Sequence, residues 1–219
     1  MSTQARRSGT AIELTLARAA EDTPSPIRTA RLFLPTRISV NQPRDLPPRI
    51  DTERIPYQYP QPRDMRPEQV IPNALPKPDD PAWIRLSDHA WSRPLQYNVS
   101  AGQYTHILRV TKAGVIARHR HSGGVHAYVI KGRWHYLEHD WVAEEGSYIF
   151  EPPGETHTLV VPEGCTEMVT LFQVTGSLMY VDPYGKSTGY DDVFTRIEIA
   201  RKYYERSGLG AAYVDQFIR

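Results

Sequence analysis

The sequence predicts an all-β fold, an antiparallel sandwich or barrel, with a proline-rich arm before it and helices after it. Three observations lead to this prediction. Prolines crowd the first third of the chain, short β-rich runs alternate with turn residues from about residue 83, and a helical pattern closes the chain. The length of 219 residues is sufficient for one domain of moderate size with an appendage.

The proline-rich arm is expected to span residues 1–82. Fourteen of the 19 prolines fall within residues 24–81, and Gly9 is the one glycine among the first 100 residues. Repeated X-Pro steps prevent long helices and remove the N–H donors that a sheet needs. We therefore expect at most a short helix at residues 11–20, and an extended segment at residues 51–81 that lies over other parts of the protein.

The predicted barrel and its helical extension occupy residues 83–219. The β-rich runs recur about every ten residues, with glycine and proline between them, a spacing typical of antiparallel sandwiches and barrels. The expected strands are YTHILRV, VIARHRH, VHAYVIK, RWHYLEH, SYIFEPP, THTLVV, TEMVTLFQV and SLMYV.

The helical extension is expected at about residues 190–219. The stretch DDVFTRIEIARKYYERSGLG repeats apolar residues at helical spacing. The residues that should form its buried face are Val193, Ile197, Ala200 and Tyr204. Asp191 or Asp192 can cap the N-terminus, and Gly208 stands where the helix should end. The charged face is expected to be solvated, and a shorter second helix should follow at residues 211–218.

Composition excludes several classes of partner. The formal net charge of +1 leaves no electrostatic footprint for nucleic acid or an anionic membrane. No stretch approaches the roughly 20 apolar residues of a membrane span. The one cysteine, Cys165, cannot form an internal disulfide, which favours a reducing compartment. We therefore expect a cytoplasmic protein without nucleic-acid or membrane partners.

Three histidines are candidates for one metal site. In a strand, side chains two apart point to the same face, so His119 and His121 should project together. His157 follows a rigid Pro-Pro-Gly turn and enters another strand. The alternative for the first pair is a solvent-exposed strand face, where polar residues alternate in the same way.

The combined pattern resembles the paired motifs of the cupin superfamily over about residues 100–180. The residues that carry the resemblance are Gly114, His119, His121 and Gly132, followed by Gly146, Pro152, Gly154 and His157. The resemblance implies a small double-sheet barrel, also described as a double-stranded β-helix or jelly roll, with a metal ion inside it.

The sequence departs from the common cupin pattern at one ligand. The first cupin motif usually has a glutamate seven residues before its closing glycine, and that position here is Val125. His126 is either a replacement ligand or a histidine on the outer face. We expect a site of His119, His121 and His157, which leaves coordination positions open for a chelating substrate and O2. Imidazole ligands suit iron, zinc, copper and nickel alike, so the residues do not select the metal.

A narrower resemblance extends from about residue 70 to residue 219. The stretches HRHSGGVHAYVIKGRWHYLEHDW, EPPGETHTLVVP and GYDDVFTRIEIARKYYERSGLGAAYVDQFIR resemble the 2,4'-dihydroxyacetophenone dioxygenase family. This resemblance implies a non-haem Fe(II) enzyme with O2 as co-substrate. Such an enzyme cleaves an aromatic α-hydroxyketone into an aryl carboxylate and formate.

Two further residues are candidates for catalysis. Glu151 lies six residues before His157, where a carboxylate can move a proton or orient a ligand; its alternative is a surface salt bridge. Arg133, and His135 with it, should line the inner face by alternation, and Arg133 would neutralise an anionic intermediate or product. The alternative for Arg133 is a charge on the rim.

Other functions compete with the hydroxyketone dioxygenase. One is a related cupin dioxygenase that cleaves a β-diketone, and another is a sensory cupin that holds zinc. The metal discriminates them, since iron with O2 uptake favours the oxygenase and tightly held zinc without turnover favours the sensor. We also expect a homo-oligomer, a dimer or tetramer, because a barrel with open edges favours association.

Overall fold

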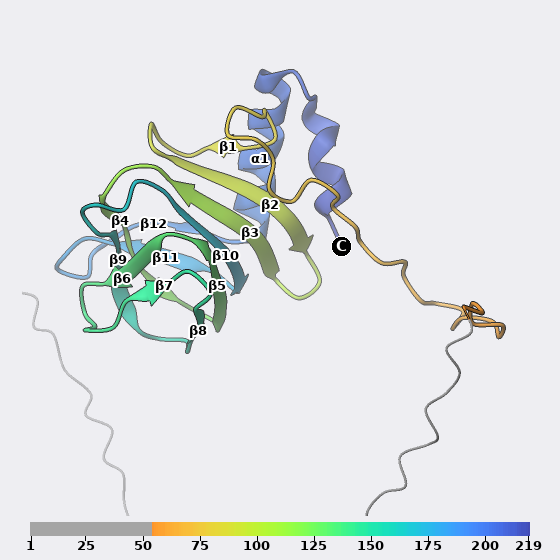
Figure 1. Cartoon of the computed structure of the whole chain (residues 1–219), viewed down its shortest axis with the longest axis horizontal. Coiled ribbons are helices and arrows are strands. Elements are labelled where there is room, and N and C mark those ends of the chain that lie inside the picture. The colour runs from red at the N-terminus through yellow and green to blue at the C-terminus, as the bar shows by residue number, and fades with distance from the viewer. Residues whose placement is uncertain (1–53) are drawn as a thin grey trace, which may run out of the picture. The chain divides into compact units, whose positions relative to one another are not determined.

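The computed structural model describes residues 54–219 (Figure 1). Residues Asp64–Arg219 form one compact unit. The predicted short helix at residues 11–20 lies outside the described residues, as does most of the predicted arm. The arm boundary at residue 82 stays a prediction.

Within the described residues, twelve strands form two six-stranded antiparallel sheets. The first sheet has the order β1-β2-β3-β10-β5-β8 and the second has the order β12-β11-β4-β9-β6-β7. The strands are β1 (Ile84–Arg85), β2 (Ala90–Asn98), β3 (Gln103–Val110), β4 (Gly114–His121), β5 (Val125–Lys131), β6 (Arg133–Tyr136), β7 (Ala143–Glu144), β8 (Tyr148–Glu151), β9 (Thr156–Val161), β10 (Met168–Thr175), β11 (Leu178–Val181) and β12 (Ser187–Asp191). The helix α1 (Val193–Ser207) and the 3-10 helix η1 (Ala211–Phe217) close the chain.

The predicted fold class is confirmed, since this is the two-sheet architecture of a cupin barrel with C-terminal helices. All eight predicted strands are present, as β3 to β6 and β8 to β11. The sequence did not predict the two-residue strands β1 and β7, nor the longer strands β2 and β12. Strand β2 contains Pro94, which is tolerated because the pairing with β3 shifts register between Pro94 and Gln96. Strand β12 is largely exposed and rich in polar residues, so it lacks an apolar alternation.

Alternation places the apolar core between the two sheets. In β5, Val125, Ala127 and Val129 are buried, while His126 and Tyr128 point outward and are exposed. Removal of such apolar side chains from water is the main stabilising contribution to a sandwich of this kind.

The turn between β5 and β6 depends on Gly132. Its φ is +75°, a left-handed conformation that favours glycine. A Cβ atom at this position would also overlap the backbone carbonyl oxygen of Glu167. Gly132 therefore allows the close approach of this turn, which crosses from the first sheet to the second, to the segment that leads into β10.

The helix α1 begins and ends as predicted. Asp192 accepts a hydrogen bond from the Thr195 N–H, and Thr195 completes the capping box by accepting from the Asp192 N–H. Gly208 adopts the left-handed conformation at the C-terminus. The four predicted apolar positions are buried, and so is a fifth residue, Arg196. The charged face is exposed as predicted, and Arg196 is a charged residue that lies on the buried face instead.

The segment from Asp64 to Ala82 has no regular secondary structure and lies against the barrel unit. The Gln69 side chain donates a hydrogen bond to the Leu95 carbonyl oxygen at 3.0 Å, and Arg93 donates to the Asn73 carbonyl oxygen at 3.3 Å. The Trp83 indole N–H donates to the carbonyl oxygens of Pro76 and Lys77. Among the described residues, no helix is long and apolar enough to cross a membrane.

Candidate metal centre

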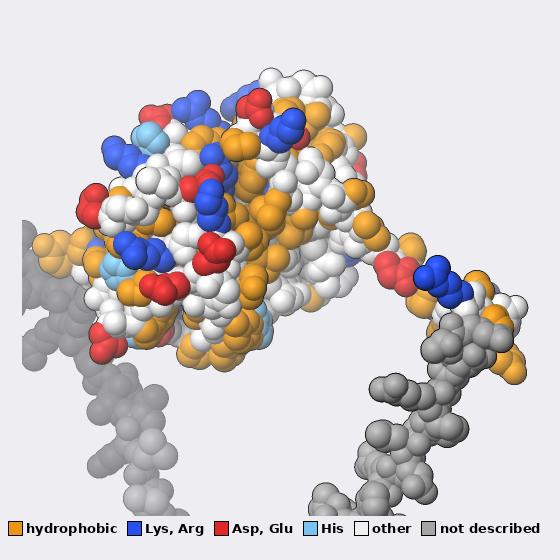
Figure 2. All heavy atoms as spheres, viewed as in Figure 1, with side chains coloured by type: hydrophobic (Ala, Val, Ile, Leu, Met, Phe, Trp, Pro, Cys, Tyr) orange, Lys and Arg blue, Asp and Glu red, His pale blue; other side chains and the backbone are white. Residues whose placement is uncertain are grey.

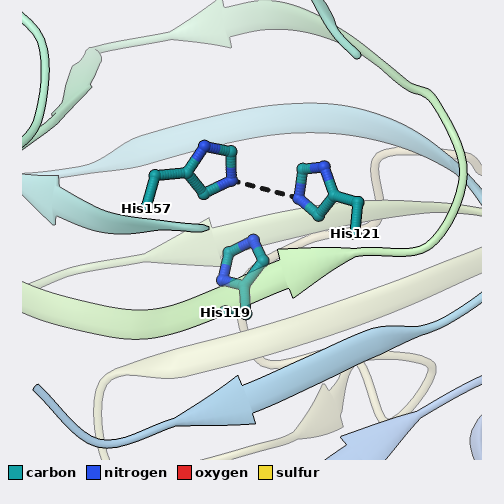
Figure 3. Close-up of side chains that lie close together, drawn as sticks. All are labelled: His119, His121 and His157. Atoms are coloured by element: carbon teal, nitrogen blue, oxygen red, sulfur yellow. Dashed lines mark hydrogen bonds between the residues drawn. The ribbon is translucent and has the colours of Figure 1, made fainter. Parts of the chain in front are cut away.

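Three imidazole rings meet inside the barrel (Figure 3). His119 and His121 come from the inner face of β4, and His157 comes from β9, directly opposite His119 in the pairing of the two strands. The ring centroids lie 4.6–5.0 Å apart, and all three side chains are buried. His119 and His121 therefore do not lie on a solvent-exposed strand face, which was the alternative considered from the sequence.

The ring nitrogens have the spacing of metal ligands. One nitrogen from each of the three rings lies within 4.8 Å of the other two. The Nε2 atoms of His121 and His157 are 3.1 Å apart. Two nitrogens that bind one ion at about 2.1 Å, with an angle near 90° between them, are separated by about 3 Å. The observed spacing therefore fits two adjacent ligands of one ion.

Burial keeps these imidazoles neutral at neutral pH. It lowers the pKa of His119 to about 3, of His121 to about 4 and of His157 to about 3. Repulsion from neighbouring rings is a second, smaller cause of the low pKa of His119 and His157. A neutral imidazole offers a nitrogen lone pair, which is the form that binds a metal ion.

Glu151 brings a carboxylate to the same place from a neighbouring strand. It ends β8 and pairs with Val125, the β5 position at which the usual cupin glutamate is missing. Its Oε2 atom lies 3.2 Å from His121 Nε2 and 3.6 Å from His157 Nε2. The side chain is 4% exposed, so the surface salt bridge considered above is excluded. Glu151 is therefore placed either to bind the same ion or to act beside it.

The protonation of Glu151 is adjustable near neutral pH. Burial raises the pKa of this carboxyl to about 7, although the nearby Tyr136 hydroxyl lowers the pKa in part. A carboxyl with such a pKa can accept or release a proton at physiological pH.

The residues around His157 fix its orientation. The Tyr136 ring stacks on the His157 ring at a centroid distance of 3.6 Å and an interplanar angle of 8°. The next residue, Thr158, donates from its N–H and its hydroxyl to the Glu138 carboxylate at 2.7 and 2.8 Å. These contacts hold β9 and its histidine in register beside β6.

The structure overturns the prediction for Arg133 and His135 and decides between the two alternatives for His126. Arg133 is exposed, and it is Trp134 and Tyr136 that face the interior from β6, so the inner-face prediction for Arg133 and His135 is wrong. The register with β9, in which His135 pairs with Val160 and Tyr136 with Leu159, sets this orientation. His126 points outward, with Nδ1 2.6 Å from the Tyr148 hydroxyl, so it does not replace the missing glutamate.

A cavity of about 530 Å³ adjoins the site. His119, His121, Tyr136 and Glu151 contribute to its lining. Most of the remaining wall is apolar, from leucine, isoleucine, valine, alanine and phenylalanine side chains. A chamber of this size and character suits a small, largely apolar organic ligand that meets polar groups at a few points.

A second polar group on the cavity wall was not found from the sequence. It consists of His106, Tyr180, Asp191 and Arg196. His106 and Tyr180 lie outside the histidine motifs, and Asp191 was considered as a helix cap. Arg196 precedes Ile197 and shares the apolar face of α1. An arginine on the apolar face of a helix is the signal that could have revealed this polar group.

The donor set fits a bound cation. The Glu151 carboxylate is buried, and neither of its oxygens accepts a hydrogen bond from residues 54–219. Its Oε2 atom is 3.2 Å from His121 Nε2, which is itself 3.1 Å from His157 Nε2, and both of these rings are neutral. A cation there gives the carboxylate and the imidazole lone pairs a common partner.

Comparison with known proteins supports the fold and leaves the activity open. Residues 73–178 match the family model described as the ChrR cupin-like domain. No curated protein matches the sequence. An RmlC-like cupin protein from Ralstonia eutropha JMP134 is 25% identical, with a TM-score of 0.54, and the match covers 57% of this chain and 83% of that chain.

Two further solved structures share the architecture. A protein of unknown function with a cupin-like fold, also from Ralstonia eutropha JMP134, is 21% identical, with a TM-score of 0.53 and coverage of 55% of this chain and 75% of that chain. An acetylacetone dioxygenase from Acinetobacter johnsonii is 16% identical, with a TM-score of 0.53 and coverage of 68% and 99%. At such identities the likeness shows the fold alone. The predicted cupin fold is confirmed, and the narrower resemblance to one dioxygenase family stays a prediction.

Proposed function

We propose that this cupin-fold protein is a non-haem Fe(II) dioxygenase that cleaves the carbon–carbon bond of an aryl α-hydroxyketone with O2. One ArCO–CH2OH and one O2 give one aryl carboxylic acid and one formic acid, so that each product receives one oxygen atom of O2. The observation that carries the proposal is the convergence of three buried, neutral imidazoles beside a chamber of about 530 Å³.

The residues that would hold the iron are His119, His121 and His157. Bound Fe(II) would supply Lewis acidity toward a chelating ketone and a route for electrons to O2. Glu151 either completes the ligand set or takes a proton from the α-hydroxyketone, since its Oε2 atom lies 3.2 Å from His121 Nε2. The apolar wall excludes water from the reacting carbons.

Two other functions are alternatives to the hydroxyketone dioxygenase. The first is a β-diketone-cleaving dioxygenase, since a β-diketone also chelates through two oxygens. The second is a zinc-binding sensory cupin, since imidazole ligands suit zinc as well as iron. A cytoplasmic location remains part of the proposal.

The test is anaerobic reconstitution of the full chain with Fe(II), followed by O2 and a panel of aryl α-hydroxyketones and β-diketones, with products identified by mass. We expect aryl carboxylate and formate, each with one ¹⁸O atom when ¹⁸O2 is supplied. Cleavage confined to β-diketones would select the first alternative. Tight zinc retention with no turnover of either ketone class would select the second.

A matched pair of variants assigns the activity to the site. His157→Ala should lose both iron and turnover, whereas His126→Ala, on the outer face of β5, should keep both. Full turnover by the His157→Ala protein would contradict the proposal.

A further inference from the structure

Two turns beside the barrel centre bring a histidine and a carboxylate together. His139 lies in the connection between β6 and β7, and Glu155 lies in the connection between β8 and β9. The His139 Nε2 atom is 2.9 Å from Glu155 Oε1, and both side chains are partly exposed. Neither residue belongs to the candidate metal centre described above.

This pair lies beside His157, with the spacing of metal ligands. One ring nitrogen of His139, one ring nitrogen of His157 and one Glu155 carboxylate oxygen all lie within 4.8 Å of one another. The 2.9 Å between His139 and Glu155 is close to the roughly 3 Å that separates adjacent ligands at about 2.1 Å from one ion. Two imidazoles and one carboxylate are a ligand set that zinc uses in proteins.

His157 has a second ring nitrogen to complete this set. Its Nε2 atom faces His121 Nε2 at 3.1 Å inside the barrel. Its Nδ1 atom lies on the side of the ring away from His119 (Figure 3), and it is buried without a hydrogen-bond partner within residues 54–219. A buried nitrogen without a partner is costly, and the second nitrogen of a metal-binding histidine normally has one. A cation held by His139 and Glu155 would supply the missing partner.

Contacts with other residues hold the two turns in position. The His139 ring stacks on the Trp141 ring at a centroid distance of 5.3 Å and an interplanar angle of 17°. In the turn before Glu155, the Gly154 N–H donates to the His121 carbonyl oxygen at 3.0 Å. Ligands that are already positioned lose less conformational entropy when they bind an ion.

A simpler role for Glu155 is to accept a hydrogen bond from the Nδ1–H of His157 and so orient the ring. That role requires only one carboxylate, and it gives no place to His139. A cation uses all three groups, because each imidazole offers a lone pair and the carboxylate offers a negative charge that offsets part of the charge of the ion.

We propose that His139, Glu155 and the Nδ1 atom of His157 form a second cation site, the rim site, which binds Zn(II) and shares the His157 ring with the ion inside the barrel. A ring bound through both nitrogens gives up its N–H proton to water when the second ion binds. Zinc is the ion expected, because nitrogen and oxygen ligands bind Zn(II) more tightly than Fe(II). The inference goes beyond the proposed function and does not depend on the substrate.

The experiment is equilibrium dialysis of the metal-free full chain against a series of buffered Zn(II) concentrations, with bound zinc measured by atomic absorption. We expect about two zinc ions per chain at saturation in wild type and about one in His139→Asn. The control His89→Asn, which removes an exposed histidine elsewhere, should bind as much zinc as wild type. Equal zinc content in wild type and folded His139→Asn would overturn the inference.

A second variant covers the case in which His139→Asn does not fold. Glu155→Gln keeps the size of the side chain and removes its charge, so it should also lower the zinc content by about one ion. Its control is Glu163→Gln, at an exposed position, which should leave the zinc content unchanged. A full zinc content in Glu155→Gln would overturn the inference as well.

Two further variants test whether the ring is shared. His121→Ala removes a ligand of the barrel ion alone, so it should keep the zinc that His139→Asn loses. His157→Ala removes a ligand of both ions, so both zinc ions should be lost. Retention of the rim zinc by His157→Ala, at wild-type affinity, would overturn the sharing of His157.

Failure of this inference is distinguishable from failure of the proposed function, because dialysis measures no turnover. A rim zinc lost in His139→Asn, with no ketone cleavage by the iron form, would leave the rim site standing and remove the dioxygenase. Ketone cleavage by the iron form, with equal zinc content in wild type and His139→Asn, would do the reverse.

Discussion

Glu151 is the residue on which the character of the candidate metal centre depends. It ends β8 and stands opposite Val125, the β5 position at which the usual cupin glutamate is missing. Its Oε2 atom is close enough to two imidazole nitrogens to share their ion, and burial also makes it an acid with a pKa of about 7. A metal ligand and a proton carrier are different roles, and one substitution at Glu151 distinguishes between them.

We predict that Glu151→Gln retains iron and loses turnover by roughly 10²- to 10⁴-fold, the usual loss on removal of a general acid or base. The amide keeps the size of the side chain but cannot exchange a proton. Iron content and the initial rate of O2 uptake would be measured together. The control is Glu144→Gln, at an exposed position of β7. Loss of iron from the Glu151→Gln protein would instead identify Glu151 as a ligand.

His106 provides a prediction about pH and stability. Burial, together with the nearby Arg196, lowers the pKa of His106 well below 6.5, so the folded protein keeps this ring neutral. The unfolded chain protonates it below about pH 6.5, hence the free energy of unfolding falls as pH falls below that value. We predict that His106→Asn flattens this dependence by up to about 1.4 kcal/mol per pH unit.

The measurement is urea unfolding of the metal-free protein between pH 7 and pH 5 or so. His89→Asn is the control, because His89 is exposed. If the free energy of unfolding depended on pH equally in wild type and His106→Asn, His106 would bind the same number of protons in the folded and the unfolded protein.

At this scale the sequence predicted the site in part. Strand alternation suggested that His119 and His121 project together, and the resemblance to the paired cupin motifs joined them with His157. The orientation of Arg133 could not, because it depends on how β6 pairs with β9. The role of Arg196 was missed because it requires knowing that α1 packs beside β12 and its Asp191.

Among the elements, β5 and β6, consecutive strands that belong to different sheets, constrain the site most. Strand β5 aligns Val125 with Glu151, and β6 brings Tyr136 onto His157. Gly132 connects the two strands with a φ of +75° and lies against the backbone of Glu167. The turn residue is therefore expected to be more sensitive to substitution than other glycines of positive φ.

We predict that Gly146→Ala costs about 1 to 3 kcal/mol, the strain of a side chain in the left-handed region, since nothing lies within 4 Å of its added Cβ. Gly132→Ala should lose a further 1 to 3 kcal/mol or so, because its Cβ overlaps a backbone oxygen. Urea unfolding of both variants gives the difference. Equal losses would mean that the backbone relaxes away from the contact at Gly132.

The elements were predicted well where apolar alternation or capping residues were strong. The start of helix α1 could be narrowed to Asp191 or Asp192 from the sequence, of which Asp192 is the N-cap, and its end could be placed at Gly208, since caps act locally. Strand β2 could not be predicted, because its Pro94 reads as a strand breaker and is accommodated only by a register shift against β3.

For the whole molecule, association of identical chains stays a prediction. Hydrophobic side chains gather in a band over the sheet that contains β2, β3, β10 and β5 (Figure 2). On β5 and on β8, which ends this sheet, Tyr128, Tyr148 and Phe150 are about half exposed or more. Exposed aromatic side chains beside an unpaired strand edge favour self-association.

We predict a solution mass that is a multiple of the 25.0 kDa chain, two or four times that value. Light scattering coupled to gel filtration of the full chain would measure it at several protein concentrations. A single species of one-chain mass at the highest concentration would refute the prediction.

The most direct test of the account is a crystal structure of the iron-loaded protein with data collected at the iron absorption edge. Three imidazoles from β4 and β9 should share one ion. We predict a single anomalous peak inside the barrel, at about 2.1 Å from one nitrogen of each of His119, His121 and His157. A peak bound by fewer than these three rings, or iron located elsewhere on the chain, would contradict the account.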